Sequence, residues 1–159
     1  MAIVSASSVV QVLKLASGRI GKDQYYASYT AGRFVVGDDM AAARYIQAKT
    51  APTDGVAVFG NNTLINFLSG RANPTRFLSG GALTLGSGSA IRSAYRHEYM
   101  NGLQKALPAY IVVGVAFGAL TKEQAIQSFP EFETLLHERY ALETQIGYLD
   151  LYHATILKK

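Results

Sequence analysis

The sequence predicts an α/β fold, a three-layer α/β/α sandwich with a Rossmann-like, mostly parallel sheet of about five strands. Two short apolar runs, residues 56–59 and 109–115, are typical of parallel strands that are buried on both faces. Segments with helical periodicity alternate with these runs, which favours strands joined by helices. Gly147 separates two further short runs near the end of the chain and predicts an antiparallel C-terminal hairpin.

The composition indicates one globular domain and excludes several kinds of chemistry. The chain has 159 residues, of which 49% are hydrophobic and 16% charged, so it can bury a sizeable core. Its net charge of +4 is not gathered into runs of Lys or Arg, so we expect no nucleic-acid partner. The absence of cysteine excludes disulfides, cysteine-ligated zinc and thiol catalysis. The longest charge-free stretches, residues 55–70 and 106–121, are shorter than a membrane span, which favours a soluble domain.

Residues 1–37 are predicted to form a helical segment that precedes the α/β domain proper. An apolar helical pattern ends at Gly18, which is suited to a helix C-terminus, and a second short helix is predicted over residues 22–29. Gly32 and Gly37 bracket a linker. The domain of residues 38–159 then begins with a helix that Asp38 or Asp39 caps and that ends before Pro52.

The next elements follow from turn residues and apolar runs. Strand 56–59 leads through Gly60 into a short helix that ends at Gly70, and residues 75–78 are predicted as a second strand. The glycine- and serine-rich residues 79–89 indicate a loop before a long helix over about residues 87–105.

Two helix starts are predicted after strand 109–115. Thr121 with Gln124 forms a capping-box pattern, and Pro130 suits the first position of a helix.

The turn after strand 56–59 holds the first pair of candidate ligand-binding residues. Asn61 and Asn62 lie where the carboxyl end of a parallel strand often contributes to a binding site, and their amides suit a sugar or a head group. The competing interpretation is a turn glycine at Gly60 followed by a helix-capping asparagine. The turn matches neither common glycine-rich phosphate-binding pattern, so we expect no nucleotide cofactor in this fragment.

Arg71 and Arg76 are the second candidate pair. They flank a short polar segment and could bind a phosphate or a carboxylate together. The alternative is that one of them pairs with a carboxylate of the chain and fixes the loop. No nucleophile motif is present, and neither His97 nor His137 extends into a zinc-binding motif, so the sequence predicts no catalytic residue and no metal site.

Several motifs in order resemble the soluble tail of bacterial polytopic membrane glycosyltransferases related to dolichyl-phosphate-mannose–protein mannosyltransferases. The resemblance covers about residues 15–152 and departs from the family at Asn61-Asn62 and at His153-Ala154. The segments that carry it are Gly18-Arg19, Asp23-Gln24-Tyr25, Ala42-Ala43-Arg44-Tyr45-Ile46, residues 50–60, residues 65–77, Tyr95-Arg96-His97-Glu98, residues 108–113 and residues 129–152.

The resemblance implies a non-catalytic domain of a longer enzyme. In that family a multi-span membrane region holds the catalytic carboxylate and binds the polyprenyl-phosphate-linked sugar donor. The domain would lie on the periplasmic side of the bacterial inner membrane, dock on the membrane-embedded part of its own parent and contact a lipid-linked sugar or an acceptor glycan. Two alternatives remain open: an independent small Rossmann-like transferase that binds a nucleotide or a sugar phosphate, and a protein-interaction module. An exposed apolar patch on the N-terminal helix would favour the interaction module or the membrane junction.

Overall fold

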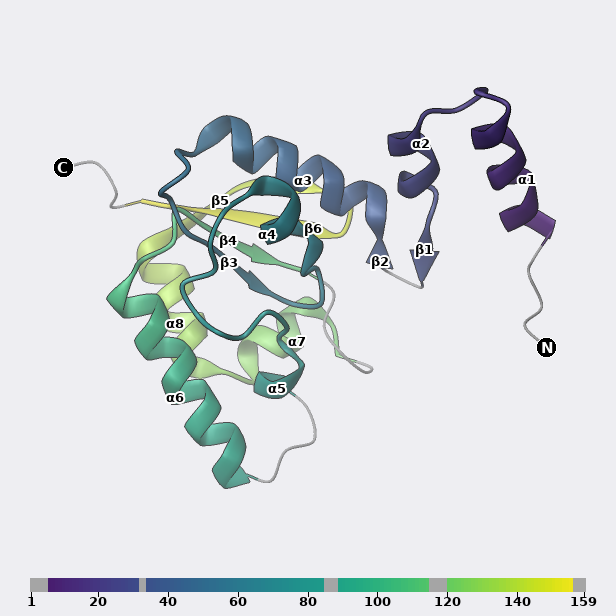
Figure 1. Ribbon diagram of the computed structural model, residues 1–159. Coiled ribbons are helices and arrows are strands. Elements are labelled where there is room, and N and C mark those ends of the chain that lie inside the picture. Colours follow the sequence, from purple (N-terminus) through teal and green to yellow (C-terminus); the bar gives the residue numbers. More distant parts are fainter. Residues whose placement is uncertain (1–5, 32–33, 85–88, 115–119, 156–159) are drawn as a thin grey trace.

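The computed structural model describes residues 6–31, 34–84, 89–114 and 120–155 (Figure 1). An N-terminal segment comes first, with α1 (Ala6–Ala16), α2 (Lys22–Ala27), β1 (Thr30–Ala31) and β2 (Phe34–Val35). The α/β body comprises α3 (Val36–Lys49), β3 (Val56–Phe59), α4 (Leu64–Ser69), α5 (Gly81–Thr84), α6 (Ser89–Lys105), β4 (Tyr110–Val113), α7 (Lys122–Gln127), α8 (Pro130–Arg139), β5 (Tyr140–Ile146) and β6 (Leu149–Ala154).

The main sheet has four strands in the order β3-β4-β6-β5, and β3 and β4 form its one parallel pair. β6 pairs antiparallel with both β4 and β5, as the predicted C-terminal hairpin requires. The α/β class and the hairpin are therefore confirmed. The predicted mostly parallel sheet of about five strands is not found in the part of the chain that the structure describes.

Residues 75–78 account for one missing strand. The side chain of Asn73 accepts a hydrogen bond from the Thr75 amide at 3.0 Å and donates one to the Phe77 carbonyl at 3.2 Å, which holds the segment in turns. The edge of β3 is instead bonded by the chain before this segment, because the Val56 amide donates to the Ala72 carbonyl at 2.9 Å. Residues 75–78 themselves form no strand.

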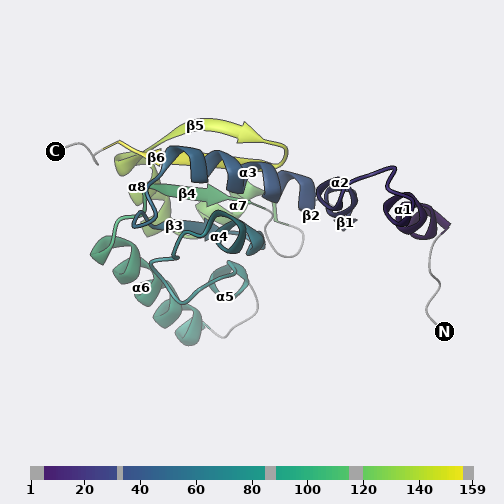
Figure 2. The ribbon, with the colours of Figure 1, turned by 45° about the horizontal axis from the view of Figure 1, so that its top comes forward.

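Helices cover both faces of the sheet, so the layered arrangement is present (Figure 2). Side chains alternate along each buried strand: Val56 and Val58 of β3 face α3 and α4, while Ala57 and Phe59 face α5 to α8. The second face has an aromatic core in which the rings of Phe59 and Phe132 stack at 4.4 Å. Because side chains on both faces of these strands are buried, β3 and β4 are apolar at every position.

The N-terminal segment projects away from the body (Figure 1). Gly18 follows α1 with a φ of 70°, as predicted for a helix end, whereas α2 is shorter than predicted. β2 lies within the predicted linker and pairs antiparallel with β1, which precedes the linker. The predicted capping aspartates are wrong, because α3 begins earlier, after Val35, and places both Asp38 and Asp39 inside its first turn.

Several local predictions are confirmed in detail. Gly70 ends α4 in the left-handed conformation, and Gly147 turns the hairpin with a φ of 55°. Thr121 and Gln124 form both hydrogen bonds of a capping box, and Pro130 begins α8. The predicted loop 79–89 contains the short helix α5, while its residues 85–88 and the strand end at Val115 lie outside the described residues. Among the described helices, none has the length and apolar character that a bilayer crossing requires.

Candidate functional site

The carboxyl ends of β3 and β4 lie side by side, and the predicted asparagines are found there. Asn61 accepts a hydrogen bond from the Ser79 hydroxyl at 3.0 Å. Asn62 is buried, and its amide donates to Asp39 Oδ1 at 2.6 Å. Both side chains therefore join the β3–α4 turn to other parts of the chain, and their predicted contact with a ligand stays a prediction.

Three glycines close the space between the two strand ends. A Cβ on Gly60 would lie 3.0 Å from the Gly114 backbone, and one on Gly80 would lie 3.1 Å from the Gly60 nitrogen. The cavity that remains beside them is about 10 Å³, no more than one water needs. Among the described residues, the crevice where a parallel α/β sheet usually binds its ligand is thus filled.

Asp39 is a buried carboxylate at this closed end. Its Oδ1 accepts from Asn62, while Oδ2 has no hydrogen-bond partner among the described residues. Burial raises the pKa of Asp39 to about 6; the Asn62 hydrogen bond opposes this rise, and the charge of Asp38 adds to it. The sequence indicated this residue only as a helix cap, since the burial arises from packing of α3 on the sheet.

A buried ion pair lies on the hairpin side of the same end. Lys122 Nζ is 2.6 Å from Asp150 Oδ2, and both side chains are only 10% exposed. Gln145 donates to the other Asp150 oxygen at 2.7 Å, and the ammonium of Lys122 lies 4.8 Å from the Tyr148 ring centroid. These contacts attach α7 to β5 and β6, and sequence analysis gave no signal for them because the partners are far apart in the chain.

Arg71 is buried and bonded within the chain. Its guanidinium donates to the Thr50 hydroxyl and carbonyl, both at 2.8 Å, to the Ser69 carbonyl at 3.1 Å and to the Gln47 carbonyl at 3.3 Å. These acceptors lie at the C-terminal ends of α3 and α4, where carbonyls lack helical partners. Arg71 therefore joins two helix ends through neutral acceptors.

Arg76 pairs with a carboxylate of the chain. This is the alternative that the sequence left open for one of the two arginines, Arg71 and Arg76. The guanidinium of Arg76 forms a two-bond pair with Glu98 of α6, at 2.5 and 2.8 Å, and this pair holds the pKa of Glu98 below its usual range. The guanidinium also lies over the Phe77 ring, 4.6 Å from its centroid. Because Arg71 is buried and Arg76 is exposed, the structure does not bring the predicted cationic pair together.

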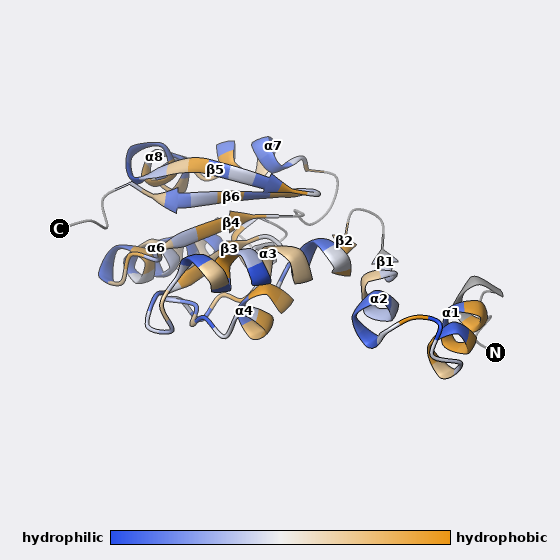
Figure 3. Ribbon diagram, turned by 90° about the horizontal axis from the view of Figure 1, so that it is seen from above, coloured by the Kyte–Doolittle hydropathy of each residue, from blue (hydrophilic) through white to orange (hydrophobic). Residues whose placement is uncertain are grey.

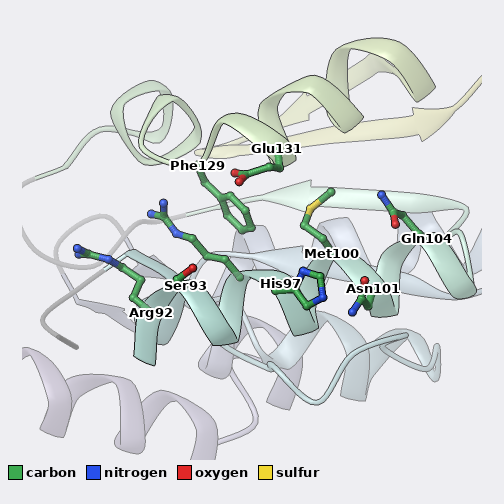
Figure 4. A pocket seen from close by; sticks show the side chains of 9 residues that line it. Arg92, Ser93, His97, Met100, Asn101, Gln104, Phe129 and Glu131 are labelled. Carbon is green, nitrogen blue, oxygen red and sulfur yellow. The ribbon is translucent and has the colours of Figure 1, made fainter. Parts of the chain in front are cut away.

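A cavity much larger than the one at the ends of β3 and β4 lies between α6 and the start of α8 (Figure 4). This cavity, which we call the α6–α8 groove, has a volume of about 540 Å³. Its polar side chains come mainly from α6, and Met100 and Phe129 are its apolar lining. The polar residues are Arg92, Ser93, Arg96, His97, Asn101, Gln104 and Glu131. A second cavity of about 510 Å³ shares Met100, Gln104 and Glu131 and extends the groove toward Leu107.

Figure 3 shows hydrophobic residues on α1, the helix that lies farthest from the sheet. Four of them are between 45% and 62% exposed: Val9, Val10, Val12 and Leu13. Lys14, Arg19 and Lys22 are exposed beside them. This is the apolar N-terminal patch by which sequence analysis would favour an interaction module or a membrane junction.

The described residues contain no group of three potential metal ligands among His, Asp and Glu. No family model matches the chain, and comparison with curated proteins and with solved structures found no match.

Proposed function

We propose that this chain is a non-catalytic, extracytoplasmic domain of an inner-membrane glycosyltransferase that uses a polyprenyl-phosphate-linked sugar donor. The motif resemblance supports the enzyme class. The observation that carries the placement is the exposed apolar surface of α1 at the end of the projecting N-terminal segment. An apolar helix surface of this kind, flanked by basic residues, suits contact with an anionic bilayer surface and with the membrane-embedded part of the parent.

The charge around α1 supports this orientation. Lys14, Arg19 and Lys22 lie on α1 or between α1 and the start of α2, and the carboxylate of Asp23 forms an ion pair with Arg44. The cations are thus left to interact with lipid phosphates, while the valines and Leu13 lie against the acyl chains.

Among the described residues, the carboxyl ends of β3 and β4 leave no open crevice, which disfavours the independent Rossmann-like transferase. Such an enzyme needs a polar pocket at this crevice, and Gly60, Gly114 and Asn62 occupy the space where its ligand would lie. The interaction module remains a second candidate function, because the exposed apolar surface of α1 suits a protein partner as well.

A vesicle flotation assay distinguishes these functions. We expect the chain to float with vesicles of phosphatidylcholine and phosphatidylglycerol, and the double variant Val9→Ser/Leu13→Ser to lose most of this binding. Phe67→Ser is the matched control, since Phe67 is an 82% exposed side chain of the α/β body. Equal binding by the double variant, or no binding by the unchanged chain, would contradict the membrane junction. Glycosyl transfer by the chain alone would contradict the non-catalytic role.

A further inference from the structure

The basic end of the α6–α8 groove has two arginines one helical turn apart. Arg92 and Arg96 repel each other at this spacing, and among the described residues Arg92 has no ion-pair partner. Burial and the charge of Arg92 lower the pKa of Arg96, and the charge of Glu131 on α8 opposes this lowering. The lining of the open cavity thus holds two arginines against one carboxylate, and this excess of positive charge indicates an anionic ligand.

Arg96 is held in place before any ligand arrives. Its Nε donates to the Leu83 carbonyl at 2.8 Å, and its guanidinium carbon lies 4.7 Å from the centroid of the Phe129 ring. Its contact with the Ser128 hydroxyl is long, at 3.4 Å. A guanidinium fixed by one backbone bond and a ring loses little conformational entropy when it binds an anion.

The rest of the groove has a different chemistry. Asn101 and Gln104 continue the line of polar residues along α6, and Glu131, from the first turn of α8, directs its carboxylate toward Phe129 at the middle of the groove (Figure 4). Amides and a carboxylate are good partners for hydroxyl groups, whereas the carboxylate of Glu131 repels a second anion. The groove therefore suits a molecule that is charged at one end and rich in hydroxyls at the other.

We propose that the α6–α8 groove binds a phosphate ester of a hydroxyl-rich ring, with the phosphate between Arg92 and Arg96 and the hydroxyls at Asn101, Gln104 and Glu131. A volume of about 540 Å³ accommodates such a small molecule. A polyanion such as a nucleic acid fits poorly, because Glu131, and Glu138 in the adjoining cavity, would lie beside its further phosphates. This inference does not depend on the membrane junction at α1.

Binding of hexose 1-phosphates tests the proposal. The chain is titrated with glucose 1-phosphate, mannose 1-phosphate, inorganic phosphate and free glucose, and amide shifts in ¹⁵N spectra locate the site. We expect saturable shifts on α6 and at the start of α8 with the hexose phosphates, weaker ones with inorganic phosphate and none with glucose. Vesicles that contain phosphatidylinositol form a second arm, because a lipid head group offers the same phosphate ester and ring.

Variants separate a role in binding from a role in folding. Arg92→Ala should weaken hexose-phosphate binding about tenfold or more, since a charge-assisted contact is lost. Lys105→Ala removes an equal charge from the end of α6 outside the α6–α8 groove and should leave the affinity unchanged. Glu131→Gln should tighten the binding of inorganic phosphate and reduce the preference for the hexose ester. Thermal melting confirms that each variant is folded.

The two arms of the experiment distinguish a free sugar phosphate from a lipid head group as the ligand. Binding that depends on Arg92 in the soluble arm supports a free sugar phosphate, and the same dependence in the vesicle arm alone supports a lipid head group of that chemistry. The proposal is overturned if neither arm responds, if Arg92→Ala and Lys105→Ala weaken binding equally, or if inorganic phosphate binds as tightly as the hexose esters.

Discussion

Replacing Asp39 by Asn should change how the stability of the chain depends on pH. The carboxylate is fully buried, one of its oxygens has no partner among the described residues, and Asn62 donates to the other. An asparagine has nearly the same shape and keeps an oxygen for the Asn62 amide, but it carries no charge to desolvate. The variant therefore removes the ionisation of Asp39 with little change in packing.

The size of the effect follows from the pKa of Asp39. It is about 6 in the folded chain, against an ordinary value of 3.8. The difference corresponds to about 3 kcal/mol, because each tenfold change in proton affinity is worth about 1.36 kcal/mol. Since the folded chain binds this proton more tightly than the unfolded chain, the stabilisation is fully present below pH 3.8 and is lost as the pH rises to about 6.

Urea unfolding at a series of pH values from 4 to 8 measures this loss. The free energy of unfolding of Asp39→Asn, minus that of the unchanged chain, should rise by about 3 kcal/mol between pH 4 and 7 and then stay level. Asp23→Asn is the control for the loss of one negative charge, because the Asp23 side chain is 72% exposed. A difference that stays flat with pH, or a slope shared with Asp23→Asn, would refute the reasoning.

Four further substitutions, arranged as two pairs, test the roles of other residues by urea unfolding. Arg71→Met should lower the free energy of unfolding by about 3 kcal/mol, because it removes the donor to the buried Ser69 carbonyl and to the part-buried carbonyls at the end of α3. Arg76→Met, at an exposed ion pair, should leave the unfolding midpoint almost unchanged. Gly114→Ala should cost about 2 kcal/mol, since its Cβ would lie 2.0 Å from Asn62 Oδ1, whereas Gly55→Ala, with its nearest neighbour at 3.6 Å, should be almost neutral. The opposite order within either pair would contradict these roles.

Sequence analysis predicted best the features that a few neighbouring residues decide. The Thr121 capping box, the left-handed Gly70 and the helix start at Pro130 each depend on contacts within one turn of the chain. The strands of residues 56–59 and 110–113 were also predictable, because burial on both faces requires an uninterrupted apolar run.

The prediction of residues 75–78 was wrong because strands need partners as well as propensity. Phe77 and Leu78 make that segment partly apolar, yet the side chain of Asn73 holds it in turns, and it is residue 72, before the segment, that bonds the edge of β3. The number of parallel strands was overestimated for the same reason. Which strands pair is a property of the whole chain, and an apolar run of four residues does not encode it.

The candidate binding residues show the same limit. The sequence indicated Asn61 with Asn62 and Arg71 with Arg76 as two candidate pairs, but each of the four also bonds a residue 18 to 24 positions away along the chain. The α6–α8 groove was not found at all, although the long helix whose face carries Arg92 and Arg96 was predicted. Nothing in the sequence indicates that Glu131 of α8 lies across from that face, and only packing on the sheet brings the two helices together.

By itself, the sequence determined the class of the fold and several of its local boundaries, because propensity, capping and periodicity are interactions between near neighbours. The tertiary structure alone decided the strand order, the exposure of α1, the closure of the crevice among the described residues at β3 and β4, and the open groove beside α6. These depend on which side chains meet across the sheet, and such contacts join residues that are far apart in the chain.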